Sequence, residues 1–92
     1  MFISAYTFTG DVTELKAGHA KMLEIMGTDG IFMHVALEGD GKLIVLDACP
    51  SREVFQEFSQ GEFFTGLMAK CGLPHPTIEP LGDVVADVFE QR

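Results

Sequence analysis

The central stretch Ile31–Cys49 constrains the fold more than any other part of the chain. In it, Asp40-Gly41 separates two apolar runs, and this dipeptide favours a tight hairpin because both central residues of a type I′ turn need positive φ. A hairpin with this tip places His34 directly opposite Asp47 on one face of the two strands. A three-residue loop, Gly39–Gly41, is the alternative, and it would move Asp47 to the face opposite His34.

The N-terminal part of the chain predicts a strand followed by a helix. Phe2–Phe8 contains aromatic and β-branched residues that favour a strand. Asp11 is a suitable N-cap, Glu14 stands at the spacing of a capping box, and Gly27 is a typical helix end. Thr28–Gly30 then predicts a turn. An apolar stripe with spacings of three and four runs along the helix and includes a histidine: Val12, Leu15, His19, Met22 and Met26.

The C-terminal half predicts a second helix, a connector and a last strand. Ser51 is the expected N-cap of the helix. Within Ser59–Glu62 the glycine weakens the helix and the two end residues have capping-box spacing, which predicts a kink or a restart. Gly72–Gly82 predicts a proline-stiffened connector, and Asp83–Glu90 predicts the last strand. The expected buried face of the helix comprises Val54, Phe55, Phe58, Phe63, Phe64, Leu67, Met68 and Cys71.

This order of elements predicts a single α+β domain over residues 1–92. The pattern βαββαβ is that of the ferredoxin-like fold, a four-stranded antiparallel sheet with two helices on one face. The strands are apolar on both faces, and 47% of the chain is hydrophobic, which is more than a lone small domain can hide. We therefore expect a homodimer. The rows of the strand before the hairpin turn are Ile31, Met33, Val35 and Leu37 against Phe32, His34, Ala36 and Glu38.

The two rows also predict on which side of the sheet each of the two histidines, His19 and His34, lies. If the wholly apolar row packs on the helices, His34 lies on the other face of the sheet. His19 points from the first helix toward the sheet. The parity of the strand therefore predicts that the two histidines do not share a site.

Charge and composition exclude several classes of partner. The net charge of −8 repels nucleic acid and anionic membranes. The N-terminus lacks the basic region of a signal peptide, and no stretch approaches the length of a membrane span. Cys49 and Cys71 are isolated in the sequence, which favours reduced thiols and a cytoplasmic location. No metal-ligand spacing or cofactor fingerprint is present, so no metal and no cofactor are expected.

Three sequence features resemble a known family. These are His34-Val35-Ala36, the pattern D-x-x-x-S-x-x-x-F-x-x-F over Asp47–Phe58, and Gly72-Leu73-Pro74-His75-Pro76. With the expected topology, they resemble small uncharacterised proteins of the dimeric α+β barrel superfamily, the antibiotic-biosynthesis monooxygenase-like group. The chain departs from that group at Cys49, where a Trp is frequent, and at Phe58, where the monooxygenase members often have a His.

His34, Asp47 and Tyr6 are the candidate catalytic residues. A carboxylate that accepts from one ring nitrogen of His34 fixes the tautomer and raises the basicity of the other nitrogen, as a general base requires. The resemblance implies that such a base withdraws a proton from the substrate, with Tyr6 or Asp47 orienting it. The structural alternative is a polar cross-strand pair that is satisfied inside a dimer interface.

A second set of residues is expected to line a pocket between sheet and helices. Methionine and aromatic side chains fill irregular spaces and suit an apolar ligand, although the same residues also make an ordinary core. His19 could position a ligand, or be a satisfied core residue. The set is His19, Met22, Met33, Phe55, Phe58 and Phe64.

The resemblance implies a cofactor-independent enzyme of monooxygenase or cyclase type that acts on an apolar aromatic or polyketide-like molecule. The alternative is a non-catalytic, small-ligand-binding or stress-related dimer. A third hypothesis is haem binding and degradation through His19. It ranks last because Phe58 occupies the position where a histidine is expected.

Overall fold

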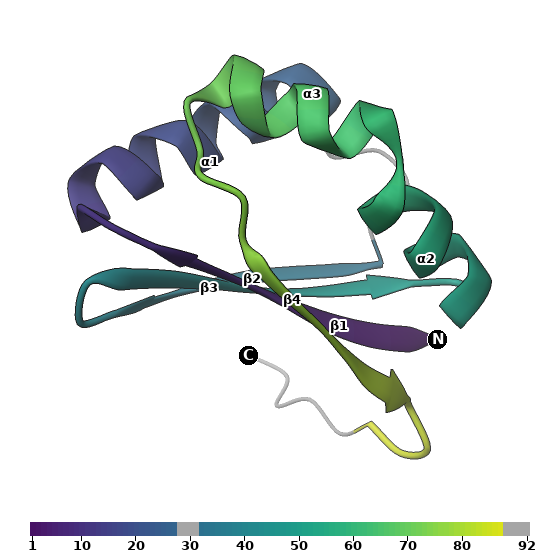
Figure 1. The fold of residues 1–92 in the computed structure, drawn as a ribbon. Helices are drawn as coiled ribbons and strands as arrows, with labels where there is room; N and C mark the ends of the chain where they lie inside the picture. The colour runs from purple at the N-terminus through teal and green to yellow at the C-terminus, as the bar shows by residue number, and fades with distance from the viewer. Residues whose placement is uncertain (28–31, 88–92) are drawn as a thin grey trace.

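The computed structural model describes residues 1–27 and 32–87. Four strands form one antiparallel sheet in the order β2-β3-β1-β4, and the helices all lie over one face of it (Figure 1). The predicted α+β, ferredoxin-like architecture is confirmed, with the second helix divided in two. In chain order the elements are β1 (Phe2–Thr9), α1 (Val12–Met26), β2 (Met33–Gly39), β3 (Lys42–Cys49), α2 (Arg52–Gln60), α3 (Glu62–Cys71) and β4 (Thr77–Asp83).

The hairpin joins β2 and β3 in the predicted register. Gly39 pairs with Lys42, and His34 pairs with Asp47. The turn itself is not type I′, because no described residue other than glycine has positive φ and only Gly41 of the two central residues adopts it. The two-residue loop length, and not the turn type, therefore fixes which side chains face one another.

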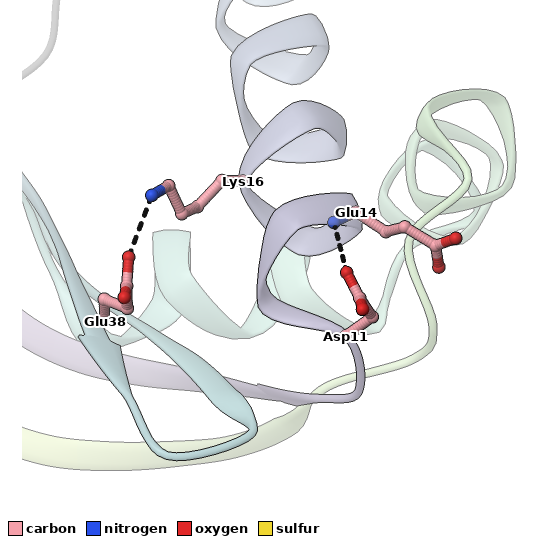
Figure 2. A network of polar contacts seen from close by, with 4 residues as sticks. All are labelled: Asp11, Glu14, Lys16 and Glu38. Carbon is pink, nitrogen blue, oxygen red and sulfur yellow. Dashed lines mark hydrogen bonds and ion pairs between the residues drawn. The ribbon is translucent and has the colours of Figure 1, made fainter.

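The ends of α1 are those expected. The Asp11 carboxylate accepts a hydrogen bond from the Glu14 backbone N–H at 3.0 Å (Figure 2). Gly27 closes the helix at φ 73°. Lys16 of α1 forms an ion pair with Glu38 of β2 at 2.9 Å, also seen in Figure 2. Because both side chains of this pair are largely exposed, it stabilises the fold by less than about 1 kcal/mol. The predicted Thr28–Gly30 turn lies outside the described residues.

The second helix restarts at Gly61, as expected. Ser51 caps α2 by accepting from the Val54 N–H at 3.3 Å. The expectation that Ser59 caps the restart is wrong: Ser59 is buried within α2, and Gly61 occupies the N-cap position of α3 without a side-chain cap. The break resets the helical phase, so that Phe64 faces the core while its neighbour Phe63 is 63% exposed. Val54, also predicted to be buried, is exposed.

The prediction of the last strand is wrong. β4 is Thr77–Asp83, within the stretch expected to be a connector, and 84–87 contain no strand. The predicted strand residues from Val88 onward lie outside the described residues. Among the described strands, β4 lies at the edge and pairs with β1 alone. An edge strand tolerates Pro80 because one side of it needs no N–H donor. Ile3 pairs with Gly82 and Ser4 pairs with Pro80, so Leu81 lies between the two paired residues and shifts the register by one.

The core lies between the sheet and the helices. From the sheet it takes Phe2, Tyr6 and Phe8 of β1 with Leu43 and Val45 of β3. From the helices and the segment after them, it takes Leu15, Met22, Phe55, Phe64, Leu67, Met68, Cys71 and Leu73.

The wholly apolar row of β2 lies on the sheet face away from the helices, which reverses the expectation. β1 points its aromatic residues and β3 points Leu43 and Val45 toward the helices, and the pairing then turns Asp47 and His34 to the same side. We call the other side the open face. Val35 and Leu37 on it are 41% and 46% exposed. Its apolar residues are Ile3, Ala5, Met33, Val35, Leu37, Ile44, Leu46 and Ala48.

Candidate functional site

A cavity of about 380 Å³ lies between the sheet and the helices. This volume falls within the range of small-molecule pockets. The central strands form its floor, and side chains of α1, α2 and α3 form its walls. The apolar lining includes Phe8, Met22, Met26, Phe55, Phe58, Phe64 and Met68.

Three polar side chains of the sheet line the same cavity: Tyr6, His34 and Asp47. His34 Nδ1 lies 3.1 Å from Asp47 Oδ1. The side chains of His34 and Asp47 are 14% and 29% exposed, so the carboxylate is the more accessible of the two. The structure thus brings the three candidate catalytic residues together at one pocket.

His19 of α1 joins this group from above the sheet. Its Nε2 lies 2.8 Å from His34 Nε2, and the two rings are inclined by only 15°. The ring centroids are 5.0 Å apart, the separation of two imidazoles that meet nitrogen to nitrogen in nearly one plane. The contact is therefore an in-line N–H···N hydrogen bond and not a face-to-face stack. The expectation that the two histidines lie on opposite sides of the sheet is wrong, because the His34 row faces the helices.

Tyr6 presents a neutral phenol to the pocket. Its ring packs against Phe55 and Phe64, with centroids 6.4 and 5.6 Å away. Burial raises the pKa of Tyr6 to about 12, the adjacent Ser4 hydroxyl opposes the rise, and the Asp47 carboxylate adds to it. Ser4 itself is fully buried, and its Oγ has no hydrogen-bond partner among the described residues. Tyr6 can therefore donate a hydrogen bond to a ligand but is a poor base at neutral pH.

Burial also shifts the pKa values of His19 and Cys49. Burial lowers the pKa of His19, and the nearby His34 lowers it further. Burial also raises the pKa of the Cys49 thiol, which donates to the Ser51 carbonyl at 3.2 Å. Cys49 lines the pocket as a neutral thiol. Sequence reasoning noted Cys49 as an isolated thiol and as a departure from a family pattern, but not as a pocket residue.

The predicted pocket set is partly in place. Met22, Phe55, Phe58 and Phe64 line the cavity. Met33 belongs to the open face and does not line it, so that assignment is wrong. His19 is not a lining residue either and reaches the pocket only through His34. Met26 and Met68, which belong to the same predicted stripe of methionine and phenylalanine residues, also line the cavity. Sequence reasoning missed Phe8, Phe32 and Val54 as lining residues.

No group of three or more His, Cys, Asp or Glu side chains converges as a metal site in 1–27 and 32–87. Within the same residues, no helix is both long enough and apolar enough to cross a bilayer.

Two solved structures share the architecture of this chain over nearly its full length. One is Rv0793 from Mycobacterium tuberculosis, with a TM-score of 0.60, 18% identity, and coverage of 99% of this chain and 98% of that one. The other is a Deinococcus radiodurans protein provisionally named an antibiotic biosynthesis monooxygenase, with a TM-score of 0.60, 12% identity, and coverage of 100% and 99%. The chain has the antibiotic-biosynthesis-monooxygenase fold. This fold is the one that the resemblance implied.

The antibiotic-biosynthesis-monooxygenase fold is recognised here through the backbone alone. At 12 to 18% identity the likeness carries no residue roles. No family model matches the sequence, and no curated protein matches it either. The chemistry of the pocket therefore rests on this chain's own side chains.

Proposed function

We propose that this protein is a cofactor-independent enzyme of monooxygenase or cyclase type that acts on an apolar aromatic small molecule. The observation that carries the proposal is a cavity whose lining is largely apolar except on its floor. Tyr6, His34 and Asp47 are the polar side chains of that floor. An aromatic ring system would bury its faces against Phe55, Phe58 and Phe64 and present a polar edge to the floor.

The reaction suited to such a site begins with removal of a proton from the bound molecule. The His34–Asp47 pair is the acid–base group, and its hydrogen bond at 3.1 Å holds the imidazole in one orientation. The neutral Tyr6 phenol donates a hydrogen bond to the oxygen on which negative charge develops. The delocalised carbanion then reacts with molecular oxygen in a monooxygenase or with an internal carbonyl in a cyclase.

We also propose that the protein works as a homodimer joined through the open face. Val35 and Leu37 are exposed there beside the partly buried Ile44 and Leu46. A contiguous apolar sheet face of this kind is costly to leave in water, and a second copy would cover it with an identical surface. Sheets paired in this way give the arrangement of a dimeric α+β barrel.

One observation favours the non-catalytic alternative. Both ring nitrogens of His34 already have partners, Asp47 at one and His19 at the other. A site of this kind can bind a ligand without accepting its proton. The same contact leaves His19 Nε2 without a free lone pair for iron, so the haem hypothesis gains no support.

Turnover separates the two functions. Purified protein is incubated with a panel of hydroxylated naphthalenes, and oxygen uptake and product masses are measured across pH. The proposal expects product, a bell-shaped rate profile, and loss of turnover in His34→Gln with the oligomeric state unchanged. Saturable thermal stabilisation by the same compounds with no product would instead establish a binding protein.

A further inference from the structure

Asp47, His34 and His19 form a continuous hydrogen-bonded chain that leads from the pocket to helix α1. Asp47 and His34 both line the cavity and lie 3.1 Å apart, and His19 follows at 2.8 Å from His34. His19 is only partly buried and does not line the cavity. The chain therefore has an inner end in the apolar pocket and an outer end outside it.

The chemistry of the contacts fixes where the protons sit. A carboxylate only accepts, so His34 Nδ1 carries the proton that is donated to Asp47. Neutral His34 then has a lone pair at Nε2, and the 2.8 Å contact requires that His19 Nε2 carry the proton donated to it. Neutral His19 is left with a lone pair at Nδ1. Every hydrogen bond in the chain thus points the same way, toward Asp47.

We propose that this chain is a proton wire between solvent and the pocket, with His19 as its outer terminus. A proton bound at His19 Nδ1 lets the proton on His19 Nε2 pass to His34 Nε2, and the proton on His34 Nδ1 pass to Asp47 Oδ1. One proton has then entered the pocket as the neutral acid of Asp47, and both imidazoles are again neutral. Both hydrogen bonds persist with reversed direction. The reverse sequence carries a proton from a ligand to solvent.

The surrounding charges suit a chain that carries one proton at a time. Two protonated imidazoles would place two N–H groups and two positive charges head to head at 2.8 Å. Burial and the proximity of His34 both lower the pKa of His19, in agreement with this geometry. Lys16 on α1 and Glu38 on β2 neutralise each other in their ion pair. The side chains of Tyr6 on β1 and Cys49 on β3, which line the same pocket, are neutral at pH 7.

The wire deepens the proposed function, because it supplies the route by which the His34–Asp47 pair would exchange its proton, but it can be tested without any substrate. The experiment is nitrogen NMR of the unliganded protein with 15N-labelled histidine. We expect scalar coupling between His19 Nε2 and His34 Nε2 through the bridging proton, and uptake of a single proton by the pair before the bridge breaks. Two histidines that titrate independently, without coupling, would overturn the proposal whatever the activity of the protein.

Two variants of His19 distinguish proton transfer through its ring from the packing of its side chain. His19→Gln keeps an N–H donor for His34 but has no second nitrogen to receive a proton, so exchange of the His34 Nδ1 proton with solvent should slow. His19→Ala should regain fast exchange when free imidazole is added, and His75→Gln on the exposed segment before β4 is the matched control. If turnover is found, we expect it to fall by roughly 100-fold in His19→Gln with KM unchanged. Unchanged exchange in both His19 variants would contradict the wire, and absence of turnover with coupling intact would contradict only the proposed function.

Discussion

Gly18 of α1 lies directly against Leu73 at the end of α3. A Cβ at position 18 would stand 2.7 Å from Leu73 Cδ2 and 3.0 Å from the Cys71 carbonyl oxygen. Real Cβ atoms essentially never come as close as 2.7 Å to another side chain, and few come as close as 3.0 Å to a carbonyl oxygen, so the missing side chain is what allows α1 to pack this closely.

We therefore predict that Gly18→Ala destabilises the protein by about 1–3 kcal/mol, even though alanine is the better helix former. Gly66 in α3 is the matched control, because nothing lies within 4 Å of its Cβ position. Gly66→Ala should stabilise the fold by about 0.5–1 kcal/mol. Urea unfolding of both variants measures the difference. Equal stabilisation by the two alanines would show that α1 does not approach Leu73 this closely.

The His19–His34 contact should appear as an energetic coupling between α1 and β2. A double-mutant cycle with His19→Ala and His34→Ala is expected to give about 1 kcal/mol of coupling in the free energy of unfolding. The control cycle uses Lys16→Ala and Glu38→Ala, which joins the same two elements through an exposed pair. That cycle should give less than about 0.5 kcal/mol and lose it in high salt. A larger coupling for the exposed pair would contradict the structure.

Tyr6 offers a spectroscopic test, because it is the only tyrosine and the chain has no tryptophan. The near-ultraviolet absorbance of tyrosinate should titrate with a pKa of about 12 in the folded protein and about 10.0 after unfolding. A pKa that is raised on folding contributes stability below pH 10, which is lost as pH rises toward 12. A folded-state midpoint near 10 would place the phenol in water instead of the pocket.

Acid should weaken the fold through His19. Its pKa is lowered on folding from the ordinary value of 6.5, so the unfolded chain binds the proton more tightly. The resulting stability is present above pH 6.5 and is lost as pH falls through the lower, folded-state pKa. The difference in unfolding free energy between wild type and His19→Gln should therefore shrink from pH 8 to pH 5. If the difference in unfolding free energy grows on acidification, the pKa of His19 is raised on folding and not lowered.

The open face provides the test of the proposed dimer. Val35→Lys and Leu37→Glu each place a charge on the apolar sheet surface, and either should shift the protein toward monomer in analytical ultracentrifugation. Val85→Lys is the control, because Val85 is 98% exposed and lies beyond the end of β4. Wild-type protein that remains a compact monomer at micromolar concentration would exclude this interface.

The sequence by itself determined the local features. Asp40-Gly41 with its apolar flanks favoured the two-residue loop whose register pairs His34 with Asp47, and the structure has that register. Asp11, Ser51, Gly61 and Gly72 marked helix ends that the structure has. These features depend on interactions a few residues apart, which a linear pattern records. The tertiary structure alone decided which face of β2 the helices cover, because the buried residues of β1 and β3 fix that choice for the whole sheet. It also placed the last strand at Thr77–Asp83, where an edge position tolerates Pro80. The contact of His19 with His34 follows from the same choice of face, since only the packing of α1 over that row brings residues of two distant elements within hydrogen-bonding distance.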